Sequence, residues 1–323
     1  AGQSLNIVYS DSTQGWLPVS DDAVADVGTL LPTQKALFAY GQDASGNLSM
    51  SNLVNSSGVV ATDTTGVGTA RTSLAASGYS SDKAIFAYGN SGSVTAISNL
   101  VSNSGVVADD VTGVGTARKD LAAAKYGGVK AIFAYGTTGS NPGVSMSNLV
   151  SSVGVISADV TGVGSARRLM GAASYGSDKA IYAFGYTGSY VNMSNLVSNV
   201  GVIGTDVTGV GTARYDLGAA GYGGDKAIMA YGGEPDRSTK SNLVSNSGVV
   251  ASDVSGVGTA RRSIAASSYG GDKAIFGYGN IAAGSGYGSM TNLVNNSGVV
   301  AADVTGVGTA RATVRAAGYS TSA

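Results

Sequence analysis

A short apolar segment recurs along the chain and dominates its hydrophobic pattern. Residues 84–88, Ala-Ile-Phe-Ala-Tyr, are apolar throughout, and clusters of Gly, Ser, Asn and Asp flank them. Apolar runs of this length are typical of strands that are covered on both faces. The flanking clusters are turn signals. The pattern therefore predicts short buried strands that are separated by tight turns.

One unit containing this segment occurs six times. An Ala-Arg pair tags each unit, and successive arginines are 47, 49, 47, 47 and 50 residues apart. Their positions are Arg71, Arg118, Arg167, Arg214, Arg261 and Arg311. The apolar segments begin at Lys35, Lys83, Lys130, Lys179, Lys226 and Lys273. A period of this size with four strands per unit is typical of a propeller blade.

Each unit is predicted to contain four strands. In one unit we expect them at 117–126, at 130–135, around 147–150 and through 154–156. The first strand is rich in Ala, which fits an innermost position where strands converge. The chain enters the repeat at a second strand and leaves it after a first strand. We therefore predict an all-β fold, a six-bladed β-propeller of four-stranded blades, closed by the C-terminal strand completing the first blade.

The predicted domains are an N-terminal arm or linker, 1–33, and the propeller, 34–323. The arm holds the only tryptophan, Trp16, and we expect burial of that side chain to anchor it. A short strand is expected at 5–9. Because the sequence starts with Ala1, we expect a processed N-terminus or the edge of a fragment.

The order of Arg, small apolar strand, aromatic-Gly strand and turn resembles kelch-type propellers. The paired glycine after the second strand occurs only at 232–233, and the blade Trp is missing. The sequence motifs Thr-Gly-Val-Gly-Thr-Ala-Arg and Lys-Ala-Ile-Phe-Ala-Tyr-Gly are similar to repeats in tail and virion proteins of bacteriophages. This resemblance covers residues 35–323. This resemblance implies a component of an extracellular virion.

Composition excludes several function classes. The chain has no Cys and no His, which removes thiolate metal sites and imidazole catalysis. Its net charge is −1 without a basic tract, so we expect no nucleic-acid partner. No apolar run approaches a membrane span, so we expect no membrane insertion. No cofactor and no metal site are predicted.

All length variation between units falls in one loop per unit, and strand directions place the six loops on one face. The loops are 41–50, 89–97, 136–146, 185–193, 232–240 and 279–290. Their Tyr, Asn and Asp side chains suit sugar or protein recognition, although loops also tolerate insertions without any function. The candidate ligand-binding residues are Asp43, Asn47, Asn141, Tyr186, Tyr190, Asn192, Glu234, Asp236, Arg237, Asn280 and Tyr287.

The six repeated arginines have two interpretations. They could form an anion-binding ring at the mouth of a central channel, or a structural ion-pair network. An Asp precedes each Arg by eight residues, at Asp63, Asp110, Asp159, Asp206, Asp253 and Asp303. A ring of unpaired arginines would repel itself, so the charges favour the structural network.

Catalysis is not expected. Glu234 is the only Glu, and with Asp236 on the same loop it makes a poor carboxylate pair.

From the variable loops and the resemblance together we predict a non-catalytic, tail-associated virion propeller that binds a host cell-surface glycan or protein through its variable loops. Its arm would contact other virion proteins. The alternatives are a purely structural virion component and a secreted bacterial binding protein.

Overall fold

The computed structural model describes residues 6–11, 15–20, 33–139, 143–281 and 286–323, and these residues form strands, turns and loops without any helix. The chain divides into two compact units, Ala1–Leu31 and Pro32–Ala323. In the first unit, strands β1 (Asn6–Asp11) and β2 (Gly15–Ser20) pair as an antiparallel hairpin. The strand that we expected at 5–9 is thus present, whereas the side chain of Trp16 lies outside the described part of the structure.

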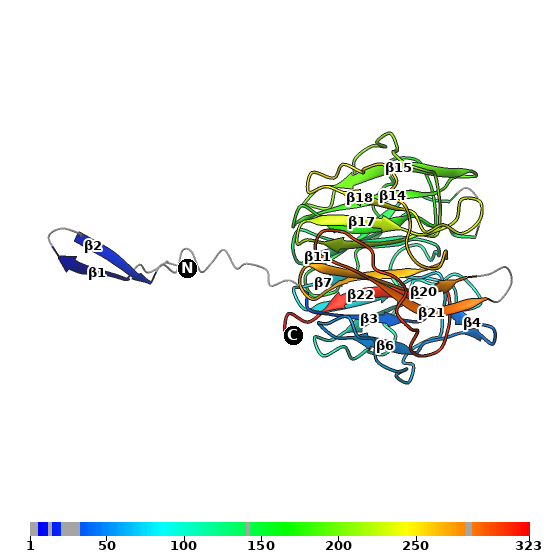
Figure 1. Cartoon of the computed structure of the whole chain (residues 1–323), viewed down its shortest axis with the longest axis horizontal. Coiled ribbons are helices and arrows are strands. Elements are labelled where there is room, and N and C mark those ends of the chain that lie inside the picture. The colour runs from blue at the N-terminus through cyan, green and yellow to red at the C-terminus, as the bar shows by residue number, and fades with distance from the viewer. Residues whose placement is uncertain (1–5, 12–14, 21–32, 140–142, 282–285) are drawn as a thin grey trace. The chain divides into compact units, whose positions relative to one another are not determined.

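The second unit is built almost entirely from short strands (Figure 1). They are β3 (Lys35–Ala39), β4 (Gln42–Asp43), β5 (Gly46–Asn47), β6 (Ser51–Val54), β7 (Ala75–Tyr79), β8 (Lys83–Ala87), β9 (Ser98–Val101), β10 (Ala122–Tyr126), β11 (Lys130–Ala134), β12 (Ser147–Val150), β13 (Gly171–Tyr175), β14 (Lys179–Tyr186), β15 (Tyr190–Val197), β16 (Gly218–Tyr222), β17 (Lys226–Ala230), β18 (Ser241–Val244), β19 (Ala265–Tyr269), β20 (Lys273–Asn280), β21 (Tyr287–Val294) and β22 (Arg315–Tyr319).

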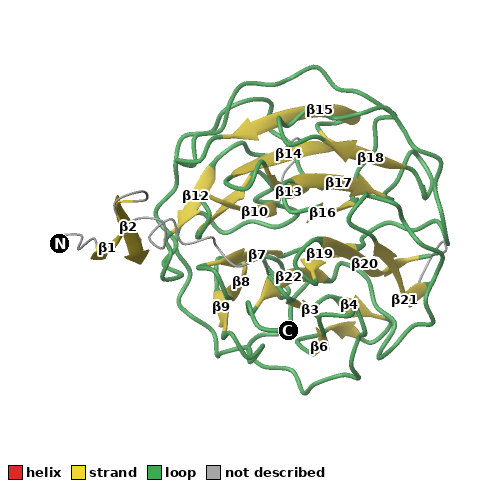
Figure 2. Ribbon diagram, turned by 60° about the vertical axis from the view of Figure 1, so that its left-hand side comes forward, coloured by secondary structure: helices red, strands yellow, loops and turns green. Residues whose placement is uncertain are grey.

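These strands form repeated three-stranded antiparallel sheets in a propeller-like arrangement (Figure 2). Five sheets are consecutive in sequence, from β7-β8-β9 to β19-β20-β21, and the sixth joins β22 to β3 and β6. The first strand of each sheet contacts those of its neighbours in the order β7, β10, β13, β16, β19, β22 and back to β7. The first strands are therefore innermost, as their small side chains predicted.

Two expected strand boundaries differ from the structure. The first strand begins at Ala122 in place of Ala117, because the arginine and the residues after it form a separate turn. The expected fourth strand is only a segment held by the isolated bridges Val150↔Ile156 and Ser147↔Val160. The Asn148 amide on the third strand donates to the Ser157 carbonyl at 3.0 Å, so a side chain replaces part of the missing ladder.

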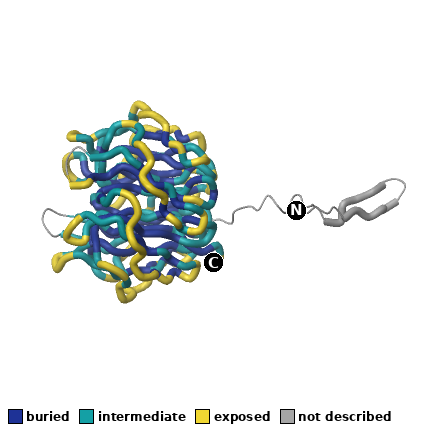
Figure 3. Tube along the Cα trace, turned by 180° about the vertical axis from the view of Figure 1, so that it is seen from behind, coloured by how far each residue is buried: buried dark blue, intermediate teal, exposed yellow. Residues whose placement is uncertain are grey.

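The core lies between neighbouring sheets. Five of the six second strands, with the residue that follows each, present aromatic side chains to both sides, and Met229 replaces one of the two in β17. Phe86, for example, contacts Tyr40 of the preceding sheet, and Tyr88 contacts Phe133 of the next, both at 5.5 Å between ring centroids. Both faces are covered, which explains the continuous apolar run in the sequence. Figure 3 shows the resulting pattern, with buried strands inside and exposed turns outside.

A buried arginine fastens the start of each first strand to the rest of its sheet. Arg71 is 0% exposed, and its Nε donates to the Tyr88 carbonyl at 3.0 Å. Its Nη2 donates to Asn99 Oδ1 at 2.6 Å, and its Nη1 lies 3.9 Å from Asp110. The guanidinium carbon is 4.3 Å from the ring centroid of Tyr40. We call this group of contacts the arginine clamp.

The clamp recurs in all six units. Every repeated arginine is 0% exposed, lies 3.4–3.9 Å from an aspartate and covers an aromatic ring of the preceding sheet at 4.3–4.6 Å. Two of the six copies are incomplete. The Nε atoms of Arg167 and Arg261 have no hydrogen-bond partner, and in the Arg167 unit Nη1 of the arginine and Oδ1 of Asn195 have none either. Both arginines belong to sheets whose second and third strands extend to eight residues.

The arginines therefore do not form an accessible anion ring at a channel mouth, and their burial agrees with the structural ion-pair network that the charges favoured. This holds for Arg71, Arg118, Arg167, Arg214, Arg261 and Arg311, which are buried between sheets. Each pairs with an aspartate of its own sheet, which follows the arginine in the chain except where Arg311 reaches back to Asp63. The long-range Arg311 hydrogen bonds join residues that are 259 and 271 positions apart.

We predict that Asn99→Ala lowers the free energy of unfolding by about 3 kcal/mol, because it leaves buried donors of Arg71 unpaired. Denaturant unfolding checks this. Asn103→Ala is the matched control in the same unit, since Asn103 is exposed and donates only to surface Asp82, at 3.2 Å. We expect this control to shift stability by less than about 0.5 kcal/mol. Equal effects of the two substitutions would refute the clamp as a source of stability.

The clamp aspartates predict a loss of stability in acid. Partial burial acts to raise the pKa of Asp110, but hydrogen bonds from Thr69 and Asn99 and the charge of Arg71 outweigh it, so the pKa is lowered. The other five clamp aspartates behave alike. A depressed pKa stabilises the fold above the unfolded-state value, and this contribution disappears as pH falls through the folded-state value.

We therefore expect the unfolding free energy to stay level from neutral pH to about pH 5 and to fall below about pH 4. Burial raises the pKa of Asp216, so protonation of this group in acid stabilises the fold, but the six clamp aspartates outnumber it. Denaturant unfolding between pH 7 and pH 2.5 measures the dependence. Asp110→Asn should be less stable at pH 7 and lose less on acidification. A profile that is flat down to pH 2.5 would contradict this account.

Candidate functional site

The variable loops lie beside the glycine-rich links that lead into the first strands. Asn192 of one loop donates to the Gly211 carbonyl at 2.7 Å, and the Arg71 amide donates to the Leu48 carbonyl at 3.4 Å. Loops and links thus share one face, as the alternation of strand directions predicted. We call it the loop face.

Several of the predicted polar residues stabilise the loops themselves. Asp43 Oδ1 accepts the amides of Ser45 and Gly46 at 2.8 and 3.2 Å, which closes its own turn. Asn47 donates to the Asn90 carbonyl of the neighbouring loop at 3.1 Å. Together with the bond from Asn192, these contacts give the three side chains structural roles.

The loop 232–240 contains a small charged network. Glu234 pairs with Lys240 at 2.9 Å and accepts from Ser238, while Asp236 is exposed and pairs with Arg237 at 2.9 Å. Arg237 also donates to Asn280 Oδ1 of the next sheet. Glu234 is thus neutralised within its own loop, and no arrangement of two free carboxylates is formed by this loop.

Two further predicted ligand-binding residues are Tyr287 and Asn141. Tyr287 begins β21 opposite Asn280 in the β20-β21 hairpin, the same register position that Tyr190 holds opposite Tyr186 in β14-β15. Asn141 lies outside the described residues.

Three tyrosines form an aromatic cluster on the loop face. Tyr190 and Tyr215 are stacked with centroids 4.9 Å apart and planes at 7°. Tyr186 lies 5.9 Å from Tyr190 and 6.4 Å from Tyr215. Tyr190 is 37% exposed, so aromatic surface remains open to solvent. We call Tyr186, Tyr190 and Tyr215 the tyrosine platform.

Two arginines flank the tyrosine platform. The guanidinium of Arg168 is 5.3 Å from the Tyr186 centroid, and that of Arg262 is 5.7 Å from the Tyr215 centroid. Arg168 pairs with Asp120 at 3.5 Å, and Arg262 donates to the Tyr215 hydroxyl. Burial raises the pKa of Tyr215 even though Arg262 acts in the opposite direction, so this hydroxyl stays protonated at neutral pH.

This arrangement provides open aromatic surface next to hydrogen-bonding groups. Aromatic faces pack against apolar C–H surface, and Arg, Asp and Tyr groups at their edge can bond to hydroxyls. The chemistry suits a ligand with both kinds of surface, such as a sugar. It offers no pair of nucleophile and base, and among the described residues no cluster of three or more carboxylates could hold a metal ion.

Sequence reasoning selected Tyr186 and Tyr190 but missed Tyr215, Arg168 and Arg262. The three missed residues occupy one position of the repeat, directly after the clamp arginine. Across the units this position holds Thr72, Lys119, Arg168, Tyr215, Arg262 and Ala312. Variation inside an otherwise fixed framework was the signal that could have identified them.

No protein-family model matches the chain, and no curated protein matches it. The described part of the chain contains no helix that is long and apolar enough to cross a membrane.

Proposed function

We propose that residues 34–323 are a six-bladed β-propeller with four-stranded blades, closed by the C-terminal strand completing the first blade. The circular contacts of the first strands and the pairing of β22 with β3 support this proposal. In this interpretation the bridged segment after each third strand is the fourth, outermost strand of its blade.

We further propose that this propeller is a non-catalytic binding module, and that its tyrosine platform binds a host cell-surface glycan. The observation that carries the proposal is the stacked Tyr190–Tyr215 pair, which leaves aromatic surface exposed beside Arg168 and Arg262. Tyrosine supplies a large contact area with only two side-chain torsions to immobilise, which keeps the entropic cost of binding low. The satisfied polar residues around it act as a rigid frame.

The biological setting is a proposal as well. The similarity of the repeat to bacteriophage tail and virion proteins supports a position on an extracellular phage particle, where the hairpin-containing unit, residues 1–31, would contact other virion proteins. A purely structural component would leave the tyrosine platform without a role, whereas a secreted bacterial binding protein would use the same platform in a different setting.

Tyr190→Ala should weaken glycan binding by roughly 10- to 100-fold, the range expected for loss of one stacked aromatic contact. Immobilised surface polysaccharides and neutral oligosaccharides, screened by biolayer interferometry, provide the measurement. The melting temperature should fall by only a few degrees, because Tyr190 is 37% exposed and the stacked pair that it forms with Tyr215 is worth about 1 kcal/mol.

Tyr287→Ala is the matched control, since Tyr287 holds the equivalent hairpin position in another sheet. We expect it to bind like the wild-type protein. Binding that survives Tyr190→Ala and Tyr215→Ala, or no binding of any glycan by the wild-type protein, would refute the platform as a glycan site.

The particle setting has its own test. An antibody against residues 34–323, applied to intact particles from the source culture, should label the tail tip or fibres in electron micrographs. Label over the shell or tube would favour a structural component, and particles without label would overturn the virion proposal.

A further inference from the structure

Six residues form a hydrogen-bonded series, which we call the collar, and two of them, Leu169 and Asp216, line the axial cavity. Its six members each lie two residues after a clamp arginine and have φ between 53° and 58°, which non-glycine residues rarely adopt. Backbone amides link successive members at 2.7–3.0 Å, for example Asp216 to the Leu169 carbonyl. The members are Ser73, Asp120, Leu169, Asp216, Ser263 and Thr313. Their backbone is therefore fixed, while their side chains differ.

The cavity inside the collar is lined mainly by small side chains of the first strands. Its volume is about 70 Å³, room for roughly five water molecules at 10–15 Å³ each. A second cavity of about 100 Å³ is lined by some of the same residues, among them Ala123 and Ala219, so the axis is hollow over both segments.

One residue breaks the repeat inside this cavity. At the first position of the innermost strand, five units have Ala or Gly, and the sixth has Arg315. The five are Ala75, Ala122, Gly171, Gly218 and Ala265. Small residues fill this position well in every other unit, so packing does not require an arginine here.

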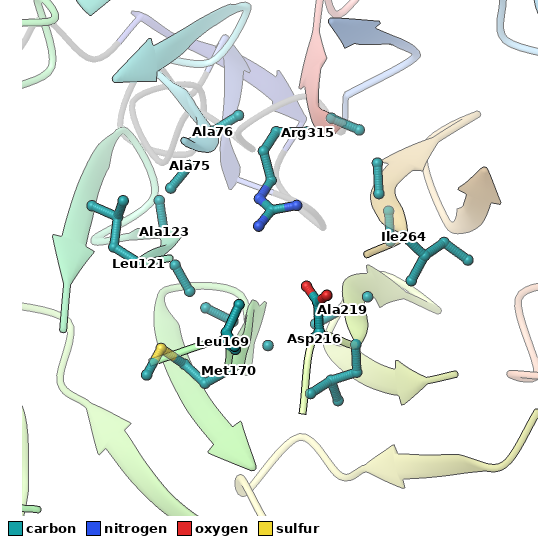
Figure 4. Close-up of a pocket in the computed structure, with 18 residues that line it drawn as sticks. Ala75, Ala76, Leu121, Ala123, Leu169, Met170, Asp216, Ala219, Ile264 and Arg315 are labelled. Atoms are coloured by element: carbon teal, nitrogen blue, oxygen red, sulfur yellow. The ribbon is translucent and has the colours of Figure 1, made fainter. Parts of the chain in front are cut away.

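Arg315 and Asp216 face each other across the cavity without forming an ion pair. Figure 4 shows the guanidinium and the carboxylate pointing toward one another. Among the described residues, no carboxylate oxygen lies within 4.0 Å of an Arg315 nitrogen, and its Nη1 donates to the Val314 carbonyl at 2.9 Å. Asp216 accepts a bond from Ser263. Two opposite charges thus remain separated by a small space.

Charge and burial restrict what can occupy that space. Both residues are half-buried, and desolvation raises the pKa of Asp216 and lowers that of Arg315, so each charge is less well solvated here than in open water. A cation would face Arg315, and an anion would face Asp216 and the nearby Asp120. A ligand with a negative and a positive group attached to the same carbon satisfies both sides.

We propose that this cavity binds a small zwitterion, an α-amino acid, whose carboxylate contacts Arg315 and whose ammonium contacts Asp216. The ring of Ala and Gly leaves space for a short side chain only, so glycine, alanine and serine are the expected sizes. This site is separate from the tyrosine platform and does not depend on the glycan proposal.

The test is ligand-observed NMR with the full chain and three probes, glycine, L-alanine and L-serine. We expect saturable binding with a Kd of about 1 mM or tighter for at least one of them. Acetate and methylamine, which each carry one of the two charges, should bind at least about tenfold more weakly, because each leaves a buried charge unpaired.

The repeat provides matched variants. Arg315→Ala installs the residue of Ala75 and Ala122, and Asp216→Ser installs that of Ser73, so both should keep the fold and lose binding. Asp236→Ser on an exposed loop and Tyr190→Ala on the platform should bind the zwitterion like the wild-type protein. The proposal is overturned if no probe binds the folded wild-type protein, if Arg315→Ala still binds, or if acetate binds as tightly as glycine.

Discussion

The arginine clamp is the interaction on which the rest of the structure depends. A buried guanidinium is stabilising only when its donors and its charge are all satisfied, because an incomplete set leaves a desolvated charge in the interior. Arg71 therefore requires the Tyr88 carbonyl, the Asn99 amide oxygen, Asp110 and the ring of Tyr40 at the same time. The amide of each clamp asparagine also donates to the clamp aspartate eleven residues later. This bond explains why the spacing from that Asn to that Asp is constant in every unit, while the loop between the second and third strands varies in length.

The same clamp connects the beginning and the end of the second unit. Arg311 reaches Asn52 and Asp63 from the far end of the sequence, and β22 supplies the first strand beside β3. Local contacts in five sheets are thus repeated in the sixth by residues at opposite ends of the chain. Because β22 pairs with β3, this side of β3 is not a free sheet edge, which removes a site for unwanted strand pairing.

Both proposed binding sites lie at repeat positions where the six units carry different residues. Outside the variable loops, the two positions after each clamp arginine carry the largest differences, and they lie on the loop face beside the axial cavity. The first position supplies Tyr215 to the tyrosine platform, and Arg168 and Arg262 flank the platform from the same position in other units. The second forms the collar, where Asp120 and Asp216 carry the charges. A fixed backbone with unlike side chains is suited to binding, since the ligand groups meet preorganised partners.

The sequence by itself determined the first three strands of each sheet, the repeat and the loop face, because apolar runs, turn residues and constant spacings are local properties of the chain. It also favoured pairing for the arginines, since charge balance can be read from composition. Only the tertiary structure decided that each arginine pairs within its own sheet, that Asp43 and Asn192 support loops, and that Tyr215 stacks on Tyr190. These contacts join residues of different strands or different sheets, and their distances depend on how the sheets pack around the axis, which no single stretch of sequence encodes.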